Sequence, residues 1–382
     1  AGARTALVAR QMPYADNRTT ALLGDSVAFL QSLGVWAHCQ ENSASMRVMR
    51  LVDDTGRLIR APDMRFSSDE LGLDAFGHNI ANRDLLAAME VRASETGLVR
   101  IDSEASAVAC TDTAVEIRCR NGVNLSARFV AGADGRNSLC RTSAGIDMTF
   151  RALKQSALTC NVTHSRPHNN VSTEFHTAHG PCVFVPLAGN RSSVVWVMPP
   201  DRAGQLAKAT IGELSAAIEI RSHFHLGSLT ADEERHVFPL AFGQTRTIAA
   251  QRIALVGEAA HVLPPIGAQG LNLGLRDAEA IGRMVRDAIT SGEDIGGSST
   301  LDAYSRERHA DIAKRSLVVG VANQSLLSNF LPAQIIRAAG MHLMNASAPL
   351  RRFVMRQAAS ANAVHSAELT TEDVIAGRSV RS

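Results

Sequence analysis

The stretch RIALVGEAAHVLPPIGAQGLNLGLRDAEAIGRMV, residues 252–285, combines three local signals that decide the fold. Its first apolar run has the length of a buried parallel strand, and Gly257 ends that run. A loop rich in glycine and proline follows, and then a helix in which Arg276 and Asp277 are predicted to face outward. The apolar face of this helix is predicted at Leu271, Leu275, Ala278, Ile281 and Val285. A strand, a loop and a helix N-terminus in this order direct backbone N–H groups at an electron-rich ligand, so the stretch predicts a cofactor-binding turn.

This stretch resembles the second flavin-binding motif of the aromatic-ring hydroxylases, flavin monooxygenases related to para-hydroxybenzoate hydroxylase. The matching residues are Gly257, Glu258, Ala259, Ala260, His261, Pro264, Pro265, Gly267, Gln269, Gly270 and Asn272. Glu258 departs from the family's aspartate, which accepts a hydrogen bond from the flavin ribityl chain, but it keeps the charge. The resemblance implies that FAD also contacts Ala268 and Leu271, and that Pro264, Pro265 and Gly267 form the loop facing the flavin ring. The alternative is an ordinary strand–loop–helix unit.

A second segment begins with another short apolar strand at residues 129–133. It continues into Asp134, Gly135, Arg136, Asn137 and Ser138, with Arg141 further on. Alone, Asp-Gly after a strand is a common turn signal. This segment precedes the flavin-binding motif at residues 252–285 in the order and at the spacing that the family shows, and it is similar to the family's Ala-Asp-Gly motif. That resemblance implies that Asp134, Gly135, Arg136 and Ser138 contribute to the flavin site and to the neighbouring path of the nicotinamide.

The beginning of the chain departs from the family pattern. A fold of this class is expected to open with a strand, a Gly-x-Gly-x-x-Gly turn and a helix, and no such turn occurs here. Residues 1–4 resemble the end of that helix, and residues 5–8 predict the second strand. We therefore expect roughly 20 to 30 further residues upstream that carry the glycine turn. The family's acidic residue for the adenosine ribose is replaced by Ala9.

Length and composition predict a soluble enzyme. With 382 residues, of which 45% are apolar and 20% charged, the chain is long enough for two packed domains. A net charge of +2 argues against a nucleic-acid partner. The six cysteines include no Cys-x-x-Cys pair, which predicts reduced thiols in a cytoplasmic protein and no metal site. No apolar run approaches the roughly 18 residues of a membrane span.

The predicted fold is α/β, with a Rossmann-like FAD-binding domain that lacks its first strand and helix, an antiparallel β-rich substrate domain and C-terminal helices. The FAD-binding domain is predicted at residues 1–141 and 252–310, the substrate domain at 142–251, a helical cap at 311–358 and a small, polar tail at 359–382. In the substrate domain, short β-rich runs at residues 156–162, 171–176, 182–186 and 193–198 predict the sheet. The side chains of His176, Phe184 and Trp196 either face a substrate or pack this sheet.

The segment NRTTALLGDSVAFLQSLGVW, residues 17–36, predicts an amphipathic helix over 22–33. It is similar to the ubiquinone-biosynthesis branch of the family, whose members hydroxylate polyprenylated phenols. The resemblance implies that Arg18 reaches the flavin pyrophosphate; the alternative is a surface arginine. Residues 73–89 are similar to the family segment in which a strand returns to the flavin and a helix follows. There, Asn82 either contacts the flavin or caps the helix.

The C-terminal region contains no acidic residue between Asp311 and Glu368, whereas basic and apolar residues are frequent. One interpretation is a membrane-surface region, since a basic amphipathic helix gains from both apolar burial and anionic headgroups. The other is a helical cap on the flavin domain. The two are compatible.

The resemblance to the aromatic-ring hydroxylases, and within them to the ubiquinone-biosynthesis branch, implies a flavin-dependent monooxygenase that uses FAD, NAD(P)H and dioxygen. In such enzymes a flavin hydroperoxide delivers one oxygen atom to an aromatic ring, here that of a polyprenylated phenol in ubiquinone biosynthesis. The resemblance implies a cytoplasmic enzyme that is peripheral to the membrane or in contact with a quinone-synthesis complex. No side chain is singled out as a general base. The alternatives are a flavoprotein reductase or oxidase of the same fold, and a non-catalytic scaffold motivated by Ala9 and the missing glycine turn.

Overall fold

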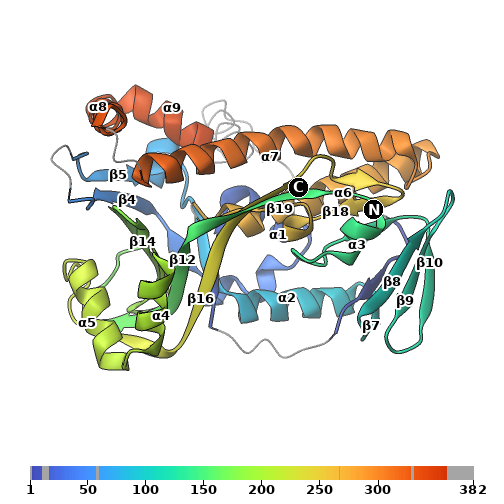
Figure 1. The fold of residues 1–382 in the computed structure, drawn as a ribbon, viewed down its shortest axis with the longest axis horizontal. Helices are drawn as coiled ribbons and strands as arrows, with labels where there is room; N and C mark the ends of the chain where they lie inside the picture. Colours follow the sequence, from blue (N-terminus) through green and yellow to red (C-terminus); the bar gives the residue numbers. More distant parts are fainter. Residues whose placement is uncertain (1, 11–16, 57–59, 266, 328–330, 359–382) are drawn as a thin grey trace, which may run out of the picture. The chain divides into compact units, whose positions relative to one another are not determined.

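The computed structural model describes residues 2–10, 17–56, 60–265, 267–327 and 331–358 (Figure 1). The chain divides into two compact units, each assembled from separated stretches of sequence. Unit 1 comprises residues 1–15, 89–153 and 240–321, and unit 2 comprises residues 16–88, 154–239 and 322–382. The tail at 359–382 lies outside the described residues.

Unit 1 has parallel strand pairs at its centre. β11 (Val130–Gly132) pairs parallel with β18 (Ile253–Leu255), in the register Val130 to Ile253. The strands that precede the two glycine-containing motifs are therefore direct neighbours. β1 (Ala6–Val8) pairs parallel with β7 (Val99–Ile101), so the strand predicted at residues 5–8 is confirmed.

The rest of unit 1 consists of a small antiparallel meander, short connecting elements and two long helices. These elements are β8 (Ala105–Cys110), β9 (Val115–Cys119), β10 (Asn124–Ala127), α3 (Leu139–Ser143), β17 (Ala249–Ala250), the 3-10 turn η4 (Gly257–Ala259), β19 (His261–Val262), α6 (Gln269–Ser291) and α7 (Ser298–Leu327). α7 ends in residues assigned to unit 2, and α2 (Asn82–Glu95) begins there. The core of unit 1 includes Ile253 and Leu255 of β18, Leu273 of α6, and Tyr304 and Ile312 of α7.

The structure corrects the predicted orientation of α6. Leu271 is 44% exposed and Ala278 is exposed, whereas Leu275, Ile281 and Val285 are buried as predicted. Asp277, predicted to face outward, is completely buried. The helix turns Leu273 and Asp277 inward because α7 supplies Asp277 with a cationic partner. A local apolar pattern contains no information about that partner.

Unit 2 is built on a sheet with the strand order β12-β15-β14-β13-β4-β5. Its strands are β12 (Met148–His164), β15 (Arg191–Met198), β14 (Gly180–Leu187), β13 (Val171–Thr177), β4 (Val48–Asp53) and β5 (Met64–Ser67). The four β-rich runs predicted from sequence are confirmed as β12 to β15. β4 pairs parallel with β13, so residues from the first hundred extend the same sheet. β12 and β16 (Leu229–Thr245) each continue from one unit into the other along the chain.

Side chains of this sheet pack largely against one another. Phe184 is 1% exposed and meets Phe175 edge-on, and Trp196 packs against the same core. His176 Nε2 donates a hydrogen bond to Glu174 Oε1 at 2.9 Å. Two helices that were not predicted from the sequence, α4 (Pro200–Lys208) and α5 (Ile211–Arg221), follow β15.

A second sheet of unit 2 has the order β2-β6-β3, formed by β2 (Thr19–Leu23), β6 (Gly77–Ala81) and β3 (Ala44–Met46). The helix predicted over residues 22–33 begins two residues later, as α1 (Gly24–Ser32), because Leu22 and Leu23 belong to β2. Gly77 permits this pairing, since a Cβ there would lie 2.0 Å from the Leu22 carbonyl oxygen. The strand and helix predicted within 73–89 are confirmed as β6 and the beginning of α2.

The remaining elements of unit 2 are short turns and the C-terminal helices. They are η1 (Trp36–His38), η2 (Gln40–Asn42), η3 (Ser68–Leu71), α8 (Leu331–Ala346) and α9 (Ala348–Ala358). α9 is attached within the unit by an ion pair from Arg351 Nε to Glu70 Oε2 at 2.8 Å.

Candidate flavin site

The structure brings the two predicted motifs of unit 1 together. Besides the pairing of β11 with β18, the Arg136 guanidinium forms an ion pair with Glu258 at 3.2 Å. Arg141 donates to the carbonyl oxygens of Ala259 at 3.0 Å and of Arg136 at 2.8 Å. Residues that are more than a hundred positions apart in sequence therefore form one surface, on which Glu258 and Arg136 remain accessible.

The Asp134 turn is held by its own side chains. The Asp134 carboxylate accepts hydrogen bonds from Ser138 Oγ at 2.5 Å and from the Cys140 backbone N–H at 3.0 Å. Ser138 is buried and caps α3, because its Oγ accepts from the Arg141 N–H at 2.8 Å. Gly135 has a φ of +77°, a left-handed conformation that favours glycine. The segment thus has a turn function, and the cofactor roles of Asp134, Gly135, Arg136 and Ser138 stay predictions.

The second motif separates into an internal and an accessible set of residues. The internal set consists of Ala259, Ala260, His261, Pro264 and Asn272. The accessible set, which we call the loop edge, consists of Pro265, Gly267, Gly270 and Leu271. A ligand could contact the loop edge directly, whereas the internal residues hold the backbone that presents it.

The loop enters α6 through a left-handed turn. Gly267 has φ +64° and Ala268, the N-cap residue, has φ +54°. Ala268 offers no side-chain cap, and Asn272 Nδ2 instead donates to its carbonyl oxygen at 2.6 Å. At the first turn of α6, within the described part of the chain, the N–H groups of Gln269, Gly270 and Leu271 therefore have no side-chain cap.

These features fit a flavin. Uncapped N–H groups at the positive end of a long helix stabilise negative charge on an electron-rich ring. A Cβ at Gly270 would meet no protein atom within 4 Å, so glycine at this position leaves space at the surface rather than inside the fold. Gly274 lies in a different environment, because a Cβ added there would lie 3.4 Å from the Gly257 Cα. At this position α6 therefore passes close to the Gly257 turn.

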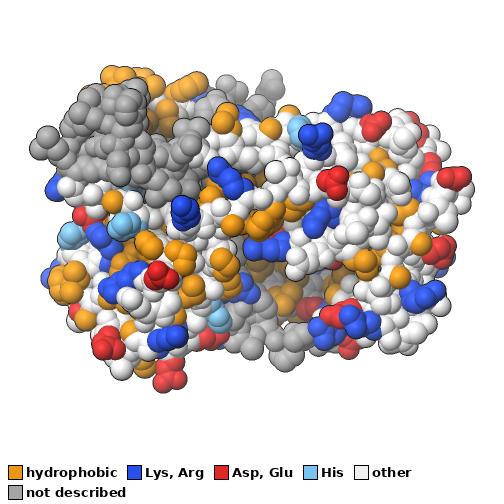
Figure 2. Space-filling model, viewed as in Figure 1, with side chains coloured by type: hydrophobic (Ala, Val, Ile, Leu, Met, Phe, Trp, Pro, Cys, Tyr) orange, Lys and Arg blue, Asp and Glu red, His pale blue; other side chains and the backbone are white. Residues whose placement is uncertain are grey.

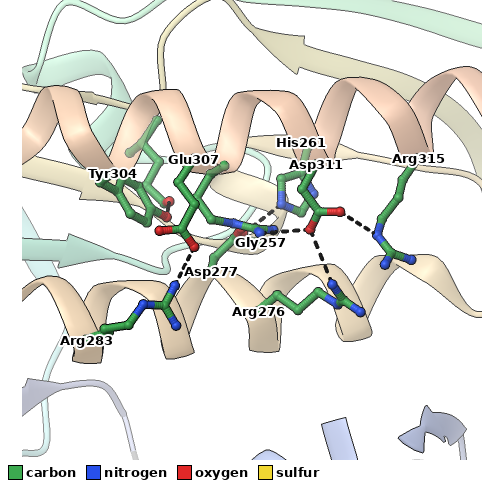
Figure 3. Close-up of polar contacts among 11 residues, drawn as sticks. Gly257, His261, Arg276, Asp277, Arg283, Tyr304, Glu307, Asp311 and Arg315 are labelled. Atoms are coloured by element: carbon green, nitrogen blue, oxygen red, sulfur yellow. Dashed lines mark hydrogen bonds and ion pairs between the residues drawn. The ribbon is translucent and has the colours of Figure 1, made fainter. Parts of the chain in front are cut away.

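Asp277 is the centre of the internal support of this motif (Figure 3). Its carboxylate accepts from the Gly257 N–H at 3.0 Å, pairs with His261 Nε2 at 2.7 Å and accepts from Arg308 Nε at 2.8 Å. Asp277 is completely buried, and both His261 and Arg308 are less than 5% exposed. A buried carboxylate with three donors holds the turn at Gly257 in one geometry.

The support continues along one face of α7. Arg308 also donates to Asp311 at 2.8 Å, Asp311 accepts from Arg315 Nε at 2.9 Å, and Arg315 donates to the Gln269 side-chain oxygen at 2.9 Å. Asp277, Arg308, Asp311 and Arg315, which we call the α7 network, thus connect Gly257 at the start of the motif to Gln269 at the start of α6. One turn earlier in α7, the Tyr304 hydroxyl donates to the Leu255 carbonyl oxygen of β18 at 2.8 Å.

The charges of the α7 network stabilise one another. Burial by itself would lower the pKa of Arg308. The negative charge of Asp277 and the hydrogen bonds to Asp277 and Asp311 have the larger effect, so the pKa of Arg308 is raised. Burial likewise raises the pKa of Asp311, and its bonds to Arg308 and Arg315 reverse this, so its pKa is lowered. The roles of these residues were not predicted from the sequence. Tyr304, Arg308, Asp311 and Arg315 follow a spacing of four, three and four residues, which is the signal that places them on one helix face.

The predicted cofactor residues of unit 2 lie next to each other. The Asn82 N–H donates to the Arg18 carbonyl oxygen at 2.9 Å, and Thr20 Oγ1 donates to Asn82 Oδ1. Asn82 is the first residue of α2, and the Arg18 guanidinium lies 5.3 Å from the centre of the Phe238 ring. Their roles toward FAD stay predictions.

Comparisons with known proteins identify the family of this chain. The FAD binding domain family matches residues 1–317. The ubiquinone hydroxylase UbiL of Rhodospirillum rubrum is 28% identical over 90% of this chain and 79% of its own length. The 3-demethoxyubiquinol 3-hydroxylase of Escherichia coli is 28% identical over 90% of this chain and 87% of its own.

Solved structures share the fold. p-Nitrophenol 4-monooxygenase PnpA of Pseudomonas putida aligns with a TM-score of 0.73 at 18% identity, over 93% of this chain and 91% of its own. A mutant of PqsL from P. aeruginosa aligns with a TM-score of 0.73 at 22% identity, over 89% of this chain and 93% of its own. The chain therefore belongs to the FAD binding domain family of flavin-dependent monooxygenases.

Proposed function

We propose that this protein hydroxylates the aromatic ring of a polyprenylated phenol, as in ubiquinone biosynthesis, with NAD(P)H as reductant and dioxygen as oxidant. The observation that carries the proposal is the uncapped start of α6 behind the loop edge, in a chain whose relatives over 90% of its length include ubiquinone hydroxylases. The relatives' names support the substrate class, and the loop edge supports the cofactor.

The residues proposed to hold FAD are those of the loop edge and the first turn of α6, with Glu258 toward the ribityl chain. When bound, FAD supplies the transfer of electrons from NAD(P)H and the activation of dioxygen. The first-turn N–H groups of α6 stabilise negative charge at the ring. Glu258 reaches a ribityl hydroxyl only by sharing its carboxylate with Arg136, its partner at 3.2 Å. Arg136 therefore positions Glu258.

We also infer that unit 2 contacts a membrane surface through α8 and α9. Leu343 and Phe353 are 59% and 61% exposed, and Arg352 and Arg356 lie on the same helix as Phe353. Exposed apolar side chains beside arginines suit the interface of an anionic bilayer, where a polyprenylated substrate would be found. Among the described residues, no helix combines the length and the apolar character that crossing a bilayer requires.

The experiment is a turnover assay with FAD, NADH or NADPH, and a 2-polyprenylphenol under isotopically labelled dioxygen. A product that gains one labelled oxygen atom supports the proposal. Consumption of NAD(P)H with hydrogen peroxide and no oxygenated product would instead identify an oxidase. Failure to bind FAD at all would favour a non-catalytic scaffold. Cosedimentation of a Leu343→Ser/Phe353→Ser variant with anionic vesicles tests the membrane contact, which the variant should weaken.

A further inference from the structure

Unit 1 contains a cavity of about 410 Å³ bordered by β12, β16 and α7. The residues that line it and carry the argument are Thr149, Arg151, Phe242, Arg246, His309 and Ser316. None of the residues predicted to bind FAD is among its lining residues. The lining of the cavity and the predicted FAD-binding residues are therefore different sets of residues.

The lining is basic without acidic compensation. It includes two arginines and a histidine, and no aspartate or glutamate. Within the described part of the chain, Arg151, Arg246 and His309 form no ion pair with a carboxylate. Other arginines of α6 and α7 differ, since Arg283 pairs with Glu307 and Arg315 with Asp311. Cations that share a concave surface and have no counter-charge attract an anion.

The geometry of Arg151 suits such a ligand. Its guanidinium lies 5.4 Å from the centre of the Phe242 ring. Stacking on an aromatic ring orients the guanidinium plane and leaves its N–H edge available for two parallel hydrogen bonds. A planar edge of this kind matches the oxygen pairs of phosphate and carboxylate groups.

Two residues with hydroxyl groups line the cavity, one from β12 and one from α7. Thr149 and Arg151 are two residues apart on β12, so their side chains leave the same face of the strand. His309 and Ser316 are seven residues apart on α7 and share a helix face. Thr149 and Ser316 both line the cavity, and the hydroxyl of neither forms a hydrogen bond with another of the residues that the structure describes.

We propose that this cavity binds a phosphate ester. Two arginines, a histidine and two hydroxyls offer more donors than the two oxygens of a carboxylate accept, whereas the three oxygens and nearly two charges of a phosphate monoester match them. The volume lies near the lower end for small-molecule sites, which suits a group the size of glycerol phosphate. On the face shown in Figure 2, Lys and Arg side chains lie among hydrophobic ones. A phosphate ester of this size occurs both in soluble metabolites and in the headgroups of anionic phospholipids.

The cavity adjoins the flavin motif through the backbone. Leu263 lines it and immediately precedes Pro264, and Gln244, another lining residue, pairs with His261 across β16 and β19. A bound phosphate ester would contact the strand that leads into the loop edge. The proposal does not rest on the proposed function, because it concerns binding without turnover.

The test is calorimetric titration of the purified protein with inorganic phosphate and with glycerol 3-phosphate, without NAD(P)H or aromatic substrate. We expect saturable binding that Arg151→Gln/Arg246→Gln weakens at least about tenfold. The matched control is Arg118→Gln, an exposed arginine of β9 outside the cavity, which should leave the affinity unchanged. Thr149→Val/Ser316→Ala provides a second variant that keeps every charge and should weaken binding several-fold.

A second arm separates the two sources of the ester. Two proteins are compared: the Leu343→Ser/Phe353→Ser variant, and the same variant that also carries Arg151→Gln/Arg246→Gln. Each is sedimented with vesicles of phosphatidylcholine alone and with vesicles that also contain phosphatidylglycerol. Retention on phosphatidylglycerol that depends on the two arginines identifies a lipid headgroup, and binding of glycerol 3-phosphate alone identifies a soluble ester. Absence of binding in both arms overturns the proposal. So does an equal loss in the cavity variant and in Arg118→Gln, because that result reports only net charge.

Discussion

The loop edge and the α7 network support the same turn by opposite means. The loop edge acts through its backbone, with left-handed φ angles at Gly267 and Ala268 and N–H groups at the start of α6. The α7 network acts through buried and half-buried side chains that join Gly257 to Gln269. The loop edge is therefore tested by adding a side chain where the backbone approaches the ligand. The α7 network is tested by removing a charge. Substitutions of each kind should therefore affect different measurements.

The largest effect is expected from Arg308→Gln. Removing one partner of a buried ion pair leaves the Asp277 charge uncompensated, and such changes cost about 3 to 5 kcal/mol of unfolding free energy. The measurement is urea unfolding at neutral pH. Arg283→Gln is the matched control, because its ion pair with Glu307 joins the same two helices at the surface and should contribute at most about 1 kcal/mol. Similar losses in both variants would contradict the assignment of Asp277 as a buried centre.

A double variant distinguishes the lost charge from lost packing. Asp277→Asn/Arg308→Gln removes both charges, so it should be more stable than Arg308→Gln alone. If the double variant is the less stable of the two, the hydrogen bonds of Asp277 to Gly257 and His261 outweigh its charge balance.

Gly270→Val tests the loop edge and should act on FAD rather than on stability. Its Cβ meets no protein atom within 4 Å, so the fold accepts the side chain, while a flavin ring against the first turn of α6 would be displaced. We expect FAD affinity to fall by about a hundredfold or more, equivalent to about 2.7 kcal/mol. Gly282→Val on the same helix, also with open space around its Cβ, should bind FAD normally. Equal FAD affinity in the two variants would mean that the start of α6 does not face the cofactor.

The contrast also explains which parts of the molecule the sequence could predict. The strand before the motif, the glycine turn and the helix after it are local patterns, and they appear as β18, η4 and α6. Asp277 was misplaced because one charged residue within a helix looks solvent-facing until Arg308 of α7 is known.

Long-range pairing accounts for the other differences. Leu22 and Leu23 fit a helical apolar pattern but form β2, because β6 arrives from elsewhere in the chain and accepts the pairing. Similarly, β4 was not expected in the sheet of β12 to β15, since nothing near residue 48 indicates a partner near residue 171. The FAD-binding family was predictable because its motifs are short and local.

Arg315→Gln should have a smaller effect, mainly on FAD, because its ion pair with the half-buried Asp311 contributes at most about 1 kcal/mol to stability. It removes the donor that holds the Gln269 side chain at 2.9 Å, at the entrance to α6. A hydrogen bond to a charged group contributes about 1.5 kcal/mol, and this one acts on FAD only through Gln269, so FAD affinity should fall about tenfold or less. Lys314→Gln, an exposed neighbour with the same change in charge, is the control. If the two variants bind FAD equally, the α7 network ends at Asp311 and does not reach the site.

The smallest effect is expected from Asp311→Asn, and it should depend on pH. Because hydrogen bonds and ion pairs with Arg308 and Arg315 lower the pKa of Asp311 in the folded protein, its carboxylate adds stability above the pKa of an unfolded aspartate, about 3.9. That contribution is lost as the pH falls through the lower folded pKa, where both states are protonated. The variant should therefore be about 1 kcal/mol less stable than the natural protein at neutral pH, and the difference should shrink steadily below about pH 4. Urea unfolding of both proteins across that range measures it, and a difference that grows on acidification would show that Asp311 is not held ionised by the two arginines.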